Sequence, residues 1–282
     1  MDIRVLGPLA VESDECAFDQ VAPKPRKLLA LLLAHGGQIV PLSALMAELW
    51  GTEPPVSAMT TLQTYVLQLR KALVTALGLA DHTTAKEVLV TRAGGYLFQT
   101  AGRTLDLEVF QTLTTRGRHL LAEGREHEAA AVLDQALALW RGPAFADVSV
   151  GRLLEAERAR LDECRLAAVE HRVEAYLRLG RHHEVLGDLA ALSISHPYHE
   201  SLQAQYMLAL YRAGRRPIAL DVYRRLRTTL VDEIGLEPSP RVRTLQQAIL
   251  TSDPTLDQAP GRGDLSLYRV PAQMAAPTPV HA

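Results

Sequence analysis

The sequence lacks the cysteine patterns that form disulfide frameworks or structural metal sites, and it lacks an apolar run long enough to cross a membrane. It contains only two cysteines, Cys16 and Cys164, which argues against a disulfide framework and favours a reducing, intracellular compartment. No C-x-x-C pattern suggests a zinc site. The longest apolar run, residues 28–34, is too short to span a bilayer. Because the N-terminus also lacks a charged segment followed by an apolar one, we expect a soluble, cytoplasmic protein that does not associate with membranes.

Signatures of catalysis are also missing. The chain contains neither the G-x-x-x-x-G-K-[ST] pattern that cradles phosphates nor the G-x-S-x-G turn that presents a serine nucleophile. Paired histidines and carboxylates do occur, but without a third ligand or partner at a convincing spacing. We interpret these pairs as structural or solvated: His182 with His183, His196 with His199, Glu155 with Glu157, and Asp162 with Glu163. We therefore predict a protein that is not an enzyme, with no catalytic residues, cofactor or metal.

Charge is distributed unevenly along the chain. The formal net charge is −2, which by itself does not indicate a nucleic-acid partner. Residues 1–20 contain five acidic and one basic residue, whereas residues 21–104 contain eight basic and four acidic residues. A local basic surface can bind phosphate even when the whole chain is slightly acidic. The N-terminal third is therefore the part to search for a nucleic-acid site.

The first hundred residues have the element order of a winged helix. Three short strands are expected around Ile3–Leu6, Leu9–Val11 and Phe18–Val21, followed by three helices and a β-hairpin. Gly36-Gly37 and Gly51 end the first two helices, and Ala93-Gly94-Gly95 forms the turn of the hairpin. The expected helices and hairpin strands are 27–35, 41–50, 57–77, 88–90 and 96–98.

The third of these helices carries an apolar stripe and an opposite polar row. Leu62, Val66, Leu69 and Leu73 recur at helical spacing, which predicts that this face anchors the helix to the first two. The outward row is spaced i, i+4, i+7 and consists of Thr64, Gln68 and Lys71. Side chains of these types can contact base edges in a major groove.

Two arginines and a leucine flank this row. Leu67 also faces outward, where a thymine methyl or a sugar would account for it, and Arg70 would reach a phosphate. Arg92 precedes the hairpin turn, from which a wing arginine can enter a narrow minor groove. The pattern also suits a solvated amphipathic helix with a solvated turn beside it, and spacing alone does not separate the two interpretations.

Beyond residue 104 the pattern is helical throughout. Helices are expected over residues 105–121, 125–140 and 151–179, and an internal repeat comes next. Leu179-Gly180-Arg181 and Ala213-Gly214-Arg215 lie 34 residues apart, which is the tetratricopeptide period, and Glu123-Gly124-Arg125 begins a less regular unit. Such units stack helix pairs and leave a concave face. Residues 253–282 are rich in Pro, Ala and Gly, which predicts a disordered tail.

The motifs, in this order, resemble those of the SARP family, the Streptomyces antibiotic regulatory proteins. The resemblance covers about residues 1–250 and rests on segments 25–33, 49–51, 62–73, 94–96, 138–142, 196–200, 207–215 and 232–238. It implies a mainly α fold, with an OmpR-type winged helix-turn-helix DNA-binding domain over residues 1–104. A bacterial transcriptional activator domain of tetratricopeptide-like helices would come after it, over 105–252. No ATPase module is visible after these domains, as in the small members of the family.

The resemblance also implies a function. It suggests a pathway-specific activator of a secondary-metabolite gene cluster, working on the bacterial nucleoid. Such a protein would bind direct repeats in double-stranded DNA as a dimer and recruit RNA polymerase holoenzyme through its sigma factor region. By alignment, Thr64 and Gln68 would read bases, Tyr65, Leu67 and Arg70 would contact the backbone, and Arg92 would lie on the wing. Leu67 and Gln68 replace arginines common in related winged helices, so base readout should differ here.

Two other functions remain compatible with the sequence. One is a tetratricopeptide adaptor that binds only protein, for which Arg70→Ala and Arg92→Ala would leave function unchanged. The other is a ligand-responsive repressor, which a reporter assay distinguishes from an activator by the sign of regulation.

Overall fold

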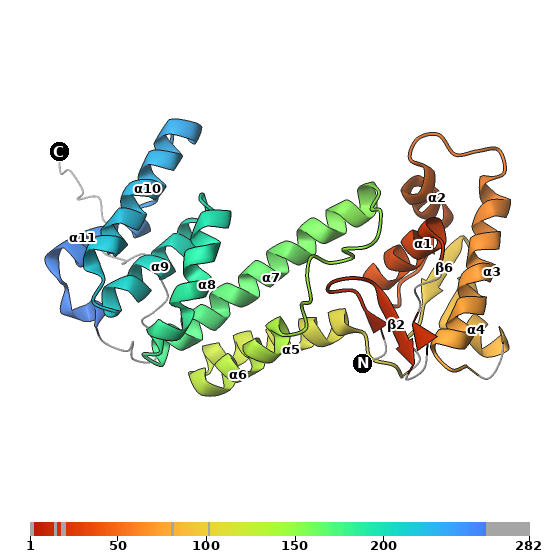
Figure 1. Cartoon of the computed structure of the whole chain (residues 1–282), viewed down its shortest axis with the longest axis horizontal. Coiled ribbons are helices and arrows are strands. Elements are labelled where there is room, and N and C mark those ends of the chain that lie inside the picture. The colour runs from red at the N-terminus through yellow and green to blue at the C-terminus, as the bar shows by residue number, and fades with distance from the viewer. Residues whose placement is uncertain (1–2, 14–15, 18–20, 80–81, 101, 258–282) are drawn as a thin grey trace, which may run out of the picture. The chain divides into compact units, whose positions relative to one another are not determined.

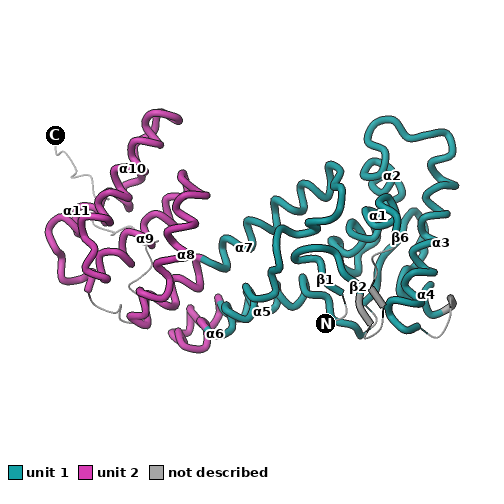
Figure 2. Tube along the Cα trace, in the orientation of Figure 1, with its two compact units in different colours: residues 1–117, 131–169 teal, residues 118–130, 170–282 magenta. Residues whose placement is uncertain are grey.

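A computed structural model describes residues 3–13, 16–17, 21–79, 82–100 and 102–257 of the chain. The chain divides into two compact units, residues 1–117 with 131–169 and residues 118–130 with 170–282 (Figure 2). Three helices, α5 (Asp106–Ala122), α6 (Glu126–Leu137) and α7 (Arg152–Arg178), have residues in both units. No helix within the described residues is both long enough and apolar enough to cross a membrane.

The first unit begins with the predicted winged helix (Figure 1). One antiparallel sheet has the order β1-β2-β3 and the other the order β4-β6-β5. In sequence, α1 separates the first sheet from β4, and α2, α3 and α4 lie between β4 and the β5–β6 hairpin, which ends the domain. The elements are β1 (Ile3–Arg4), β2 (Ala10–Ser13), β3 (Cys16–Ala17), α1 (Pro23–Ala34), β4 (Val40–Pro41), α2 (Leu42–Trp50), α3 (Ala58–Ala76), α4 (His82–Val88), β5 (Leu89–Arg92) and β6 (Gly95–Phe98).

Several boundaries differ from those expected. The first helix starts at Pro23 rather than at Lys27, because proline is tolerated in the first helical turn, where its missing N–H has no partner to lose. The third strand is Cys16–Ala17; Val21 lies outside any strand, and Phe18 lies outside the described residues. Helix α4 was not expected at all. The helix expected to reach Trp140 ends at Leu137.

One hydrophobic core runs through the first unit. It includes the buried stripe of α3 together with buried residues of α1 and of the β5–β6 hairpin. It continues without a break into the residues beyond 104: Leu105, Phe110, Trp140, Phe145, Leu154 and Leu161 belong to the same cluster. The rings of Phe110 and Trp140 meet edge to face, 5.5 Å apart between centroids. The winged helix therefore shares its core with the helices that come after it in sequence.

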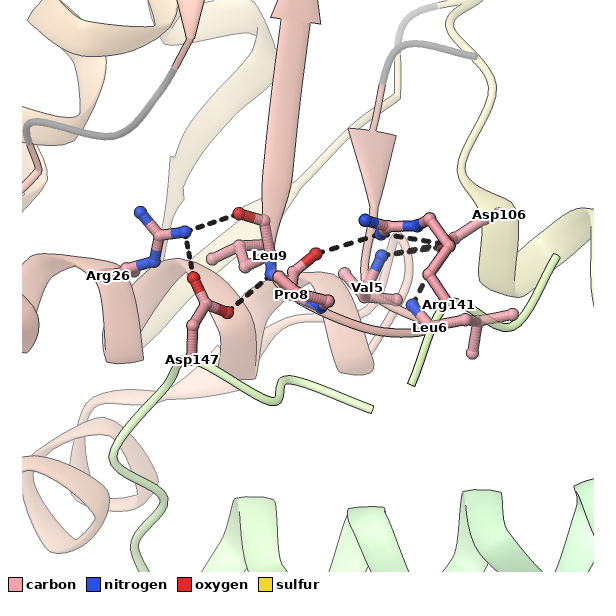
Figure 3. Close-up of polar contacts among 8 residues, drawn as sticks. All are labelled: Val5, Leu6, Pro8, Leu9, Arg26, Asp106, Arg141 and Asp147. Carbon is pink, nitrogen blue, oxygen red and sulfur yellow. Dashed lines mark hydrogen bonds and ion pairs between the residues drawn. The ribbon is translucent and has the colours of Figure 1, made fainter. Parts of the chain in front are cut away.

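Two carboxylates, the buried Asp106 and the exposed Asp147, bind backbone N–H groups within this unit (Figure 3). Asp106, which is 1% exposed, accepts hydrogen bonds from Val5 N at 2.8 and 2.9 Å and from Leu6 N at 3.0 Å. Asp147 accepts from Leu9 N at 2.6 Å and forms an ion pair with Arg26. Because an unpaired buried N–H is costly, these side chains tie the loop after β1 to α5 and to the α6–α7 connection.

A third carboxylate caps α7. Glu48 of α2 is 3% exposed and accepts hydrogen bonds from Gly151 N at 2.5 Å, Leu153 N at 2.8 Å and Leu154 N at 3.4 Å. The first N–H groups of a helix have no partner within the helix, and a negative charge beside them is favourable. Glu48 therefore serves the N-terminus of a helix that lies about a hundred residues later in the sequence.

The second unit is built from helix pairs. Its helices beyond α7 are α8 (His182–Ser195), α9 (Glu200–Arg212), α10 (Arg216–Ile234) and α11 (Pro240–Thr251), followed by the 3₁₀ turn η2 (Pro254–Leu256). Helix α9 packs against α8, α10 and α11. The core of this unit is formed by Ala204, Met207, Leu210, Ala219, Val222, Leu226, Leu230, Val242, Leu245 and Ile249.

In the structure, each predicted repeat unit begins with the same glycine turn between two helices. Gly124, Gly180 and Gly214 each have φ of 72°, a left-handed conformation that favours glycine. After each glycine, the next residue donates its N–H to the carbonyl five positions earlier: Arg125 to Leu120, Arg181 to Tyr176, and Arg215 to Leu210. This pattern ends one helix and starts the next. The fold class expected from the sequence, a winged helix-turn-helix followed by a helical-repeat domain, is confirmed. Most of the expected tail, from residue 258, lies outside the described residues.

Candidate nucleic-acid interface

Helix α3 is anchored by its apolar stripe, as expected. Leu62, Val66, Leu69 and Leu73 are all buried, and α3 packs against α1, α2, α4 and β2. Figure 1 shows α3 on the outer margin of the first unit, with α1 and β6 on its inner side. The face opposite the stripe is therefore available to a large partner.

The opposite face presents the predicted row to solvent. Thr64, Gln68 and Lys71 are exposed, and Leu67 is 52% exposed. The Thr64 hydroxyl donates a hydrogen bond to the Thr60 carbonyl at 3.0 Å, so its methyl group and its oxygen lone pairs remain for a partner. Among the described residues, neither Gln68 nor Lys71 has a hydrogen bond or ion pair within the protein. Their polar groups are thus not engaged in holding the fold together.

The hairpin beside α3 has the geometry of a wing. Strand β5 pairs with β6 from Leu89 opposite Phe98 to Arg92 opposite Gly95. Arg92 is exposed at the end of β5 and contacts no other charged group in the described part of the chain. A Cβ at Gly95 of β6 would collide with the Val40 carbonyl of β4. Glycine at this position therefore allows β4 and β6 to pair.

Tyr65 lies beside the row but faces inward. It is half-buried, and its ring stacks on Trp50 of α2, with 6.3 Å between centroids and 18° between planes. The Lys24 ammonium of α1 lies 5.3 Å from the centroid of the Trp50 ring. A cation near an aromatic face is weakly attractive. Tyr65 thus connects α3 to α2.

Arg70 is engaged with the wing. Its Nε and Nη2 donate to the Leu89 carbonyl at 3.1 and 2.7 Å, and Nη2 also donates to the Thr91 hydroxyl at 2.9 Å. Burial lowers the pKa of the half-buried Arg70, while the nearby Tyr96 raises it to a smaller extent. Of the seven residues predicted to bind DNA, Tyr65 and Arg70 make contacts within the protein, whereas the other five are exposed: Thr64, Leu67, Gln68, Lys71 and Arg92.

Two of the paired histidines, His182 and His183, lie side by side at the start of α8. The rings of His182 and His183 lie 4.3 Å apart, and burial, His183 and Arg212 lower the pKa of His182. No group of three or more potential metal-binding side chains occurs among the described residues.

Sequence reasoning missed the three carboxylates of the first unit that bind backbone groups far away in the sequence. Asp106 is the first residue of α5, a position where acidic side chains are common, so its place in the sequence offered a signal. Asp147 and Glu48 offered none, because neither begins a helix and their partners lie more than a hundred positions away.

Comparison with known proteins agrees with this architecture. A family model described as transcriptional regulatory protein, C terminal, matches residues 20–98, and one described as bacterial transcriptional activator domain matches residues 105–250. Regulatory protein DnrI of Streptomyces peucetius is 46% identical over 258 residues, which is 92% of this chain and 95% of DnrI. Regulatory protein AfsR of Streptomyces coelicolor is 38% identical over 253 residues, covering 89% of this chain and 24% of AfsR.

A solved structure is also similar. It is Mycobacterium tuberculosis EmbR in complex with a low affinity phosphopeptide, with a TM-score of 0.83 and 33% sequence identity. The match covers 91% of this chain and 68% of that one. The two matched domains, their order and the similarity to DnrI over nearly the whole of both proteins define the family. The chain belongs to the SARP family of transcriptional regulators.

Proposed function

We propose that this protein is a sequence-specific DNA-binding transcriptional activator of a secondary-metabolite, and specifically antibiotic, gene cluster. The observation that carries the proposal is the exposed row Thr64, Gln68 and Lys71 on a helix whose opposite face is fixed in the core. A side chain reads bases best when its helix is held rigidly and it keeps groups that are not already bonded within the protein. Similarity to regulators such as DnrI supports the same conclusion.

In this proposal α3 enters a major groove. The Gln68 amide can donate and accept at once, which suits the N6 and N7 atoms of adenine. The Thr64 methyl group and the exposed Leu67 suit thymine methyl groups, and Lys71 suits a guanine edge or a phosphate. The β5–β6 hairpin brings Arg92 to the neighbouring minor groove or backbone.

The remaining parts have proposed roles as well. Residues 1–104 would form the DNA-binding domain, residues 105–252 the activator domain, and residues 253–282 a tail. Two protomers would bind side by side on direct repeats upstream of promoters in the bacterial nucleoid. The activator domain would contact the neighbouring protomer, RNA polymerase holoenzyme, or both.

A mobility-shift assay tests DNA binding most simply. The full chain is titrated against upstream regions of neighbouring biosynthetic genes and against scrambled duplexes of equal length, at several salt concentrations. We expect preference for one region and a steep loss of affinity with salt, because each phosphate contact contributes about 0.9 to the slope of log K against log salt. Binding without sequence preference and without a salt slope would rule out the proposal.

A promoter reporter then tests the sign of regulation. Deleting the gene should lower expression from the bound promoter, and Gln68→Ala should lower it too. Increased expression after deletion would indicate a repressor. An unchanged reporter with Gln68→Ala and with Arg92→Ala would indicate a protein-binding adaptor.

A further inference from the structure

We propose that Arg70 is a positioning residue that holds the wing in place beside the recognition helix, rather than a phosphate contact. The inference rests on the proposed function, because it concerns how the same surface is aligned on DNA. Arg70 would then affect DNA binding indirectly, by setting the position of Arg92.

The geometry places both donating nitrogens on the wing. Nε and Nη2 lie 3.1 and 2.7 Å from the Leu89 oxygen, and Nη2 lies 2.9 Å from the Thr91 hydroxyl. Within the described residues, Nη1 makes no hydrogen bond. An arginine whose main function was to bind phosphate would be expected to keep its fork of donors directed at solvent.

Strand β5 needs such a partner. It lies at the edge of the sheet, whose order is β4-β6-β5, so its outer backbone groups have no neighbouring strand. Leu89 is fully buried, and a buried carbonyl without a hydrogen bond is costly. The Arg70 guanidinium supplies the missing donors from α3. Lysine could not reproduce this contact, because its ammonium is a point charge without a planar fork.

The contact also determines the position of Arg92 relative to α3. Leu89 and Thr91 both belong to β5, and Arg92 is the last residue of that strand. With a rise of about 3.3 Å per residue, Arg92 lies roughly 10 Å from Leu89. Fixing two points of a four-residue strand to α3 therefore fixes the spacing between the row that reads the major groove and the arginine on the wing.

A double-mutant cycle tests this coupling. Binding of the full chain to its preferred duplex is measured by fluorescence anisotropy for Arg70→Met, Arg92→Ala and the double variant. We expect Arg92→Ala alone to weaken binding roughly tenfold, the effect of one good contact. In the Arg70→Met background the same change should cost less than about twofold, because coupled residues are not additive.

Two further variants separate positioning from charge. Lys71→Met removes an exposed cation from the next position on α3, and in that background Arg92→Ala should keep its full effect of about tenfold. Arg70→Lys keeps the charge but loses the fork, so it should behave like Arg70→Met. Thr91→Val removes one acceptor of Arg70 without altering α3, and it should reduce the effect of Arg92→Ala as well. This variant tests the same coupling if the Arg70 variants fold poorly.

The results distinguish this inference from the proposed function. If the wild-type chain shows no sequence preference, the proposed function itself fails. If it binds specifically but the effects of Arg70→Met and Arg92→Ala are additive, or Arg70→Lys restores binding and the salt slope, Arg70 is a phosphate contact and the inference is overturned. It is overturned equally if Arg92→Ala alone leaves binding unchanged, since Arg70 would then have no contact to position.

Discussion

The Asp106 carboxylate accepts hydrogen bonds from the Val5 N–H through both of its oxygens, at 2.8 and 2.9 Å. The two residues are separated by 101 positions and belong to different domains in the sequence-based division. Together with the shared core, this contact makes the first helices of the activator domain part of the folded unit that presents α3.

Removing the Asp106 carboxylate should destabilise this unit. In Asp106→Ala the buried N–H groups of Val5 and Leu6 lose their acceptor, and each unsatisfied buried group costs about 1–3 kcal/mol. We expect the free energy of unfolding, measured by urea denaturation, to fall by about 2–4 kcal/mol. Glu108→Ala is the matched control, since Glu108 is an exposed acid in the same helical turn, and it should change stability by less than about 0.5 kcal/mol. Equal effects of the two changes would contradict this role of Asp106.

The Asp106 pKa predicts a dependence of stability on pH. Burial raises this pKa, against the lowering effects of the backbone N–H groups and of Arg141. The folded chain therefore holds the proton more tightly than the unfolded chain, and the resulting stabilisation is complete below the unfolded pKa of about 4 and lost as pH rises through the folded value. The stability of wild type relative to Asp106→Asn should thus decrease from pH 4 upward and then level off. A difference that grows with pH would show that the pKa is lowered.

Gly151 should be intolerant of any side chain. A Cβ at this position would lie 2.7 Å from the Glu48 carbonyl oxygen and 2.8 Å from its carboxylate. Gly151→Ala must therefore displace the group that caps α7, and we expect a loss of about 1–3 kcal/mol in thermal or urea unfolding. Gly187→Ala, within α8 and with open space around it, should instead be neutral or slightly stabilising. Tolerance of alanine at Gly151 would mean that Glu48 does not cap the helix.

Truncation should show that the winged helix depends on residues beyond 104 for its stability. A fragment of residues 1–104 lacks the Asp106 carboxylate as well as Phe110, Phe145 and the other later members of the core, whereas a fragment of residues 1–169 keeps them. We expect cooperative unfolding, monitored by circular dichroism, from the longer fragment, and a much lower midpoint or no transition from the shorter one. Equal midpoints would mean that the shared core adds nothing to the stability of the domain.

The features predicted most accurately from the sequence are those that follow the helical period. The stripe from Leu62 to Leu73 located α3 within a residue at each end, and the same spacing identified which side chains face solvent. The glycines of the repeated turn marked helix ends because their left-handed conformation is local. Helix α4 was missed because it is only seven residues long and runs directly into β5, too short a stretch for a periodic pattern.

Contacts between residues far apart in the sequence could not be predicted from helical spacing. Arg70 was expected to point at a phosphate, because helical spacing places it beside the polar row but says nothing of a strand carbonyl 19 residues later. Glu48 lies in a mostly apolar helix, and only the folded chain brings it to the N-terminus of α7. Spacing predicts which face a side chain lies on, and the fold decides what it meets there.

The most direct test of the central claim asks whether Gln68 reads a particular base pair. Binding of wild type and of Gln68→Ala is measured on the preferred duplex and on duplexes with each base pair changed in turn. If α3 reads the major groove, Gln68→Ala loses about 1–3 kcal/mol of discrimination at one or two adjacent positions and keeps it at all others. If the variant and the wild type discriminate equally at every position, the exposed row of α3 does not read the DNA sequence.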